Sequence, residues 1–191
     1  MMKRRLITMC FAVLAVSASV AQEKTAVPPP PKPADGGPSL EITMKFIRDK
    51  IDGLDPVSFA VYFHDDVAGS DWTYQYRYEI TEVVAEPSAC SINFHSKSER
   101  DRAKFENFDA TFYLKGVEDI VVMPMEQQLK EWSMSSWSAR VDPAVFVLKV
   151  HMADKKSGTV YFFDEHLANR VAKAVVRAAE LCGGGNEAEP F

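Results

Sequence analysis

Apolar and polar residues alternate along much of the middle of the chain, a period of two that is typical of half-buried β-strands. The clearest example is the segment 72–80, in which aromatic residues and Ile80 occupy every second position. Similar alternation, together with short apolar runs, predicts seven strands, at residues 59–63, 72–80, 90–94, 108–114, 120–123, 145–152 and 160–163. Because most connections resemble hairpins, we expect antiparallel pairing in a sandwich or a partly open barrel.

A change to helical spacing predicts one helix at each end of this region. The first helix begins after Ser39, a good N-cap, and is ended by Gly53 and Pro56. Its apolar positions are Leu40, Met44, Ile47 and Ile51. The second helix begins after the N-cap Asp164 and ends before Gly183. Its apolar stripe consists of Leu167, Val171, Ala174, Ala178 and Leu181. We expect this C-terminal helix to cover an open end of the barrel and to shield its edges.

The N-terminal segment has the features of a secretory signal peptide. Basic residues at 3–5 precede an apolar run at 6–16, and small residues then lead to Ala21. We therefore predict a signal peptide at 1–21 that is cleaved after Ala21; an uncleaved anchor is the alternative. A proline-rich linker at 22–38, one globular domain at 39–183 and a polar tail at 184–191 are expected to follow. The prediction is an exported bacterial protein, periplasmic or secreted, with no transmembrane segment after cleavage.

The charge of the chain bears on its partners. The formal net charge is −5, and removal of three basic residues with the signal peptide changes it to −8. Nucleic acids and anionic membrane surfaces bind preferentially to clustered Lys and Arg, so we expect neither as a partner of this acidic chain.

Two cysteines remain after residue 21, Cys90 and Cys182. Neither has a Cys or His at the spacing of a metal site. In an oxidising compartment such a pair is a candidate disulfide, and two buried free thiols are the alternative.

The order of elements, seven strands and then one amphipathic helix, resembles the pleckstrin-homology-like (PH-like) superfold over residues 57–182. The stretch 112–120 and the turn 161–164 into the last helix are similar in character to that family. The resemblance implies a binding or interaction scaffold, although fold alone does not define function. Lipid-binding members carry basic residues between the first two strands, whereas 64–71 holds three aspartates and no Lys or Arg. The alternative fold is an α+β curved sheet of the cystatin or NTF2-like kind, which would need a long helix cradled by the sheet.

The cluster His64, Asp65 and Asp66 is the sharpest polar group in the chain. Carboxylates converging from one loop can bind a hard cation, but the ordered pattern of a calcium loop is missing. A solvated hairpin turn explains the same residues. A small metal-dependent hydrolase that uses this cluster, with help from His166, is the alternative function; otherwise no catalytic residue, metal site or cofactor is predicted.

The long connection between Pro124 and Pro143 is the preferred binding site, because Trp, Met and Arg are enriched at interfaces. Its candidate residues are Met125, Trp132, Met134, Trp137 and Arg140. A short helix over 125–132, whose tryptophan plugs the barrel, is the alternative. The aromatic row Trp72, Tyr74, Tyr76 and Tyr78 is expected to form core. The hypothesis is therefore an exported binding module without catalytic activity and with an unidentified protein partner; a small-molecule carrier with its ligand inside the barrel is a further alternative.

Overall fold

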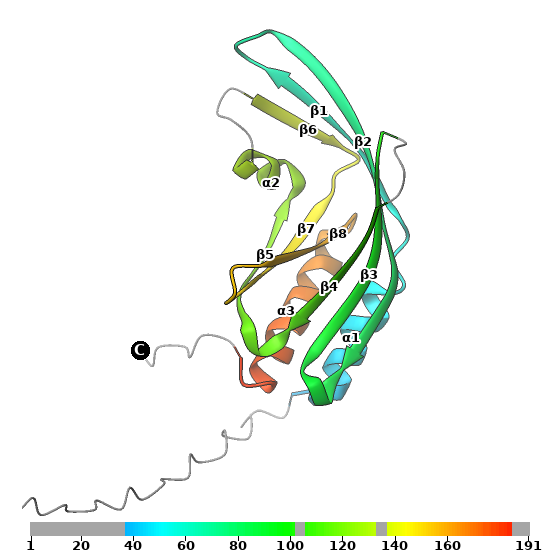
Figure 1. Cartoon of the computed structure of the whole chain (residues 1–191), viewed down its shortest axis with the longest axis vertical. Coiled ribbons are helices and arrows are strands. Elements are labelled where there is room, and N and C mark those ends of the chain that lie inside the picture. Colours follow the sequence, from blue (N-terminus) through cyan, green and yellow to red (C-terminus); the bar gives the residue numbers. More distant parts are fainter. Residues whose placement is uncertain (1–36, 102–105, 133–136, 185–191) are drawn as a thin grey trace, which may run out of the picture. The chain divides into compact units, whose positions relative to one another are not determined.

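In the part of the chain that the structure describes, the segments with a period of two form eight β-strands in two antiparallel sheets, accompanied by three α-helices (Figure 1). The computed structural model describes residues 37–101, 106–132 and 137–184. The large sheet has the order β4-β3-β2-β1-β6 and the small sheet the order β5-β7-β8. The strands are β1 (Val57–Asp65), β2 (Ser70–Glu86), β3 (Ser91–Arg100), β4 (Glu106–Tyr113), β5 (Val117–Pro124), β6 (Trp137–Asp142), β7 (Phe146–Met152) and β8 (Ser157–Phe162).

A mainly β fold with helices is thus confirmed, but the predicted number of strands was wrong. The described residues form eight strands and not seven, and their two antiparallel sheets agree with the sandwich that was predicted beside a partly open barrel. The additional strand is β6, which pairs antiparallel with β1 at the edge of the large sheet. It lies in the segment 124–143 that was predicted to be one long connection.

The inner face of the large sheet carries the aromatic row, and a bulge in β2 keeps that face apolar. The register with β3 shifts between Ile80 and Glu82. One extra residue at a bulge exchanges the two faces of a strand. Inward positions are therefore the even-numbered ones up to Ile80 and the odd-numbered ones, Val83 and Ala85, beyond it.

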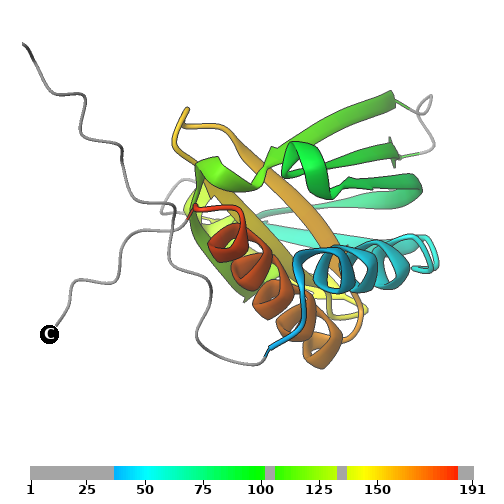
Figure 2. The same ribbon diagram turned by 90° about the horizontal axis from the view of Figure 1, so that it is seen from below.

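The two terminal helices form as expected and pack side by side (Figure 2). Helix α1 (Leu40–Ile51) begins after Ser39, whose side chain accepts a hydrogen bond from the Ile42 amide. Helix α3 (Glu165–Leu181) begins after Asp164, whose carboxylate accepts hydrogen bonds from the two amides of His166 and Leu167. Two 3₁₀ turns, Pro87–Ala89 and Leu114–Gly116, precede β3 and β5.

Two apolar clusters form the core. The larger cluster joins α1 and α3 to both sheets, and Phe162, Met44 and Ile47 are among its fully buried members. The smaller cluster lies where β1, β6 and β7 meet helix α2 (Met125–Trp132). The buried side of α3 passes through Val171, Val175 and Ala178. Leu167, Ala174 and Leu181 of the predicted stripe are only half-buried and flank it.

A disulfide joins Cys90 and Cys182, with the two Cα atoms 5.9 Å apart, as the sequence predicted. It links the segment before β3 to the residue after α3. Such a bond is compatible with an exported protein. Within the described ranges, none of the helices is both long and apolar enough to cross a membrane. The predicted signal peptide lies outside the described residues, as do most of the predicted linker and tail.

Candidate binding cavity

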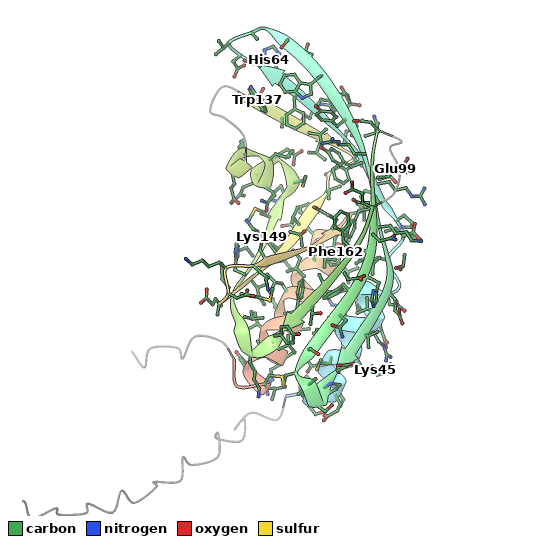
Figure 3. The ribbon with its side chains drawn as sticks, in the orientation of Figure 1. Lys45, His64, Glu99, Trp137, Lys149 and Phe162 are labelled. Atoms are coloured by element: carbon green, nitrogen blue, oxygen red, sulfur yellow. A yellow bond between two sulfur atoms is a disulfide. The ribbon has the colours of Figure 1, made fainter. Side chains whose placement is uncertain are left out.

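A cavity of about 630 Å³ lies between the inner face of the large sheet, strand β8 and helix α2. Its lining is mainly aromatic. Trp137, on β6, lies at the end of the cavity nearest α2 (Figure 3).

Cross-strand pairing between β1 and β2 builds the aromatic floor of the cavity. Phe59 lies opposite Tyr76 in the antiparallel register, and Phe63 lies opposite Trp72. Inward residues at opposite positions meet directly, so each pair stacks, with ring centroids 5.3 Å and 5.4 Å apart respectively. Trp137 of β6 then meets Trp72 edge to face at 5.1 Å. These ring contacts therefore fix the positions of the aromatic side chains on the floor of the cavity.

Strand β8 provides the facing wall. Tyr161 meets Tyr78 edge to face at 4.7 Å and lies 6.2 Å from Phe59, measured between ring centroids. Burial raises the pKa of both Tyr78 and Tyr161, and the neighbouring hydroxyls of Ser96 and Thr159 partly offset the rise. The two phenols are therefore neutral at physiological pH.

Helix α2 closes the other end through Met125 and Leu129, which line the cavity. The carboxylate of Glu126 accepts a hydrogen bond from the Val141 amide at 3.0 Å and so fixes α2 to β6. Gln128, fully buried on the same helix, finds no hydrogen-bond partner for either side-chain polar atom among the described residues. Among the described residues, the buried side-chain polar atoms without a hydrogen-bond partner all belong to this helix.

A glycine shapes the wall beneath β8. A Cβ atom at Gly158 would overlap the Cε1 and Cζ atoms of the Phe112 ring. Phe112 is itself packed against Phe94, with centroids 4.6 Å apart, and both rings line the cavity. Only a residue without a side chain allows β8 and Phe112 to approach this closely.

The structure divides the predicted binding residues. Met125 and Trp137 both line the cavity, on α2 and β6. Arg140 lies on the opposite face of β6, with its guanidinium 4.2 Å from the ring centroid of Tyr62, so it does not join them. Met134 and the side chain of Trp132 lie outside the described residues. The short helix considered for 125–132 is present as α2.

The aromatic row on β2 agrees only in part with the expected core. Trp72, Tyr74, Tyr76 and Tyr78 point to the inner face and are half-buried, and Tyr76 packs against the smaller apolar cluster. Tyr76 and Tyr78 line the cavity directly, and Trp72 supports Trp137 and Phe63 from the side. Tyr76 and Tyr78 thus form part of the cavity wall.

The His64 cluster forms the turn between β1 and β2. The Asp65 carboxylate accepts hydrogen bonds from the amides of Val67 and Ala68, at 2.9 Å and 3.1 Å. His64 Nδ1 lies 2.7 Å from the Asp71 carboxylate, and this hydrogen bond raises the pKa of His64. Asp66 lies 3.6 Å from His64 Nε2. No group of three or more His, Cys, Asp or Glu residues in the described part of the chain could hold a metal ion.

The residues of β8 and β1 that complete the cavity were not identified from the sequence; the chief ones are Phe59, Phe63, Thr159 and Tyr161. Both strands were predicted. The sequence did not show that the inner face of β1 and one face of β8 lie opposite each other. Strand β6 had a detectable signal, because Trp137, Ala139 and Val141 alternate with Ser138, Arg140 and Asp142. The residues around Trp137 could have been read as a strand on that basis.

The chain matches no protein-family model, and neither a curated protein nor a solved structure matches it significantly.

Proposed function

We propose that the protein is a binding module that holds a small apolar molecule in the cavity between the two sheets, without catalytic activity of its own. The observation that carries this proposal is the aromatic cavity of about 630 Å³. Ligand sites in proteins are typically concave, about 300–1,000 Å³ in volume, and mostly apolar with a few placed polar groups. This cavity meets each of these conditions.

The energetics favour an occupant. Phe108, a cavity residue on edge strand β4, has 46% of its surface exposed. A ligand that covers this apolar surface removes it from water, and the gain in binding free energy is about 25 cal/mol per Å² of surface covered. The floor rings are already stacked on one another, so few side chains lose freedom on binding. A preformed apolar site of this kind binds with a small loss of side-chain entropy, which favours high affinity.

The proposal includes the fold family and the compartment. We propose that the two antiparallel sheets with the amphipathic helix α3 at the C-terminal end are a variant of the PH-like arrangement, in which β6 and α2 are additions. An exported location, periplasmic or secreted, is proposed on the basis of the signal-like N-terminal pattern, and the Cys90–Cys182 disulfide supports it.

Two measurements test the binding function. Native mass spectrometry of the purified protein is expected to show added small-molecule mass, and N-phenyl-1-naphthylamine is expected to gain fluorescence on binding and to quench tryptophan emission. Phe108→Ala should weaken binding of this probe by about tenfold, the value of one well-packed aromatic contact. Tyr113→Ala is the matched control, since Tyr113 is 63% exposed on the same strand and does not line the cavity. Equal effects of the two variants, or no saturable probe binding, would contradict the proposal.

A further inference from the structure

Resting on the proposed function, we infer that the ligand is a neutral, planar aromatic molecule with one hydrogen-bonding group, and that this group lies at the Tyr78–Tyr161 end of the cavity.

The charges around the cavity argue for a neutral ligand. Of the described residues that line it, two are charged, and both have partners: Arg77 lies 3.7 Å from the Glu79 carboxylate, and Asp109 lies 2.8 Å from His95. A charged ligand would lose its hydration on entering the cavity and would meet no unpaired opposite charge among these residues. The desolvation free energy would then weaken its binding. The other lining side chains are apolar, hydroxyl-bearing or phenolic.

The shape and chemistry of the lining argue for flat rings. The aliphatic contribution comes from Met125, Leu129 and Ala110, while rings supply most of the wall. On the floor the rings of Phe59 and Tyr76 are nearly parallel, at 17°. Trp137 instead stands at 81° to Trp72. Aromatic rings prefer offset-stacked and edge-to-face partners, and this arrangement offers both to a flat ligand.

Apart from Tyr76 on the floor, the hydroxyl groups named below are collected at one end of the cavity. Tyr78 lies opposite Ser98 in the β2–β3 register, and Ser96 follows on the same face of β3. Strand β8 brings Thr159 and Tyr161 to the same end, where Tyr161 meets Tyr78. The opposite end, formed by Phe63, Trp137 and α2, is apolar. A ligand with one polar group is thus held in a single orientation, since reversing it would bury that group without a partner.

Ser96 and the two phenols suit a hydroxyl or a carbonyl equally well. The Ser96 hydroxyl donates a hydrogen bond to the Phe108 carbonyl at 3.2 Å, so its oxygen remains an acceptor. Neutral phenols both donate and accept. The ligand class therefore includes phenols, quinones and related neutral ring compounds.

Four probes test the inference: 2-naphthol, naphthalene, 2-naphthalenesulfonate and 1-decanol, each measured by displacement of N-phenyl-1-naphthylamine. We expect 2-naphthol to bind most tightly and the sulfonate to bind at least about 100-fold more weakly. Tyr78→Phe and Tyr161→Phe should each lower the affinity for 2-naphthol by up to about tenfold and leave that for naphthalene unchanged. Tyr62→Phe, on the outer face of β1, is the matched control and should change neither.

The outcomes separate this inference from the proposed function. Displacement by decanol or by the sulfonate, but not by 2-naphthol, would overturn the ligand class while leaving the binding function intact. Equal losses for 2-naphthol and naphthalene in Tyr78→Phe and Tyr161→Phe would overturn the assigned orientation. Absence of saturable binding of N-phenyl-1-naphthylamine would overturn both proposals.

Discussion

Gly158→Ala tests the packing of the cavity wall most sharply, because the added methyl group would occupy the space of a neighbouring aromatic ring. The new Cβ would overlap Cε1 and Cζ of Phe112 and lie 3.2 Å from Cδ1, whereas ordinary contacts begin at 3.4 Å. Phe112 is only 2% exposed, so protein surrounds most of its ring. The cavity is the open side of that ring, and we expect Phe112 to be displaced into it.

Overpacking of this kind costs about 1–3 kcal/mol. For a domain of this size, each kcal/mol lowers the melting temperature by about 2–4 °C. The displaced ring also takes space from the ligand, so Gly158→Ala should lower stability and probe affinity together. Gly116→Ala is the matched control, because a Cβ there meets nothing within 4 Å.

Urea denaturation and probe titration of four proteins measure these effects: the wild type, Gly158→Ala, Phe112→Leu and the double variant. Phe112→Leu alone should cost about 1–2 kcal/mol because it removes buried volume. In the double variant the smaller side chain makes room for the new Cβ, so the two losses should overlap by about 1 kcal/mol or more. Strictly additive losses would show that Gly158 and Phe112 do not share the same space, and the account of this wall would be incorrect.

Three further predictions concern the disulfide and the titrating groups. Cys90→Ser should lower the free energy of unfolding by about 4–5 kcal/mol, since the bond closes a loop with a sequence separation of 92 residues; an unchanged urea midpoint would show that the bond does not constrain the chain. Because burial raises the pKa of Tyr78 and Tyr161 above 10.0, stability should be complete below pH 10 and fall above it as the unfolded chain ionises. Replacing both by Phe should delay this alkaline transition, and an identical pH profile would count against their burial. The hydrogen bond to Asp71 raises the pKa of His64, so NMR titration should give a value above 6.5 that Asp71→Asn returns towards 6.5; a value insensitive to the substitution would rule out this pairing. The stabilisation from His64 is present below pH 6.5 and lost as the pH rises through the folded-state pKa.

Local patterns in the sequence were sufficient for most of the secondary structure. Both terminal helices were located by their N-caps, Ser39 and Asp164, because capping depends on residues close in sequence. Strand β6 was missed because it has only six residues and follows a short helix, so its alternation was taken for part of a loop. The bulge in β2 was also missed, since a register shift depends on the partner strand.

The site was predictable only in part, for a related physical reason. Met125 and Trp137 were identified by residue type, which indicates a tendency to bind but not a position in space. Arg140 was grouped with them because it is near in sequence, yet one step along a strand reverses the direction of a side chain. Tyr161 joins Tyr78 across two different sheets, and no local pattern encodes that contact.

The most direct test of the central claim is an NMR measurement of contacts between bound 2-naphthol and the protein. We predict intermolecular NOEs from the naphthol ring to the side chains of Phe63 and Tyr161, which lie on opposite walls of the cavity. Saturable binding with NOEs confined to outer-face residues such as Tyr62, and none to either wall, would contradict it.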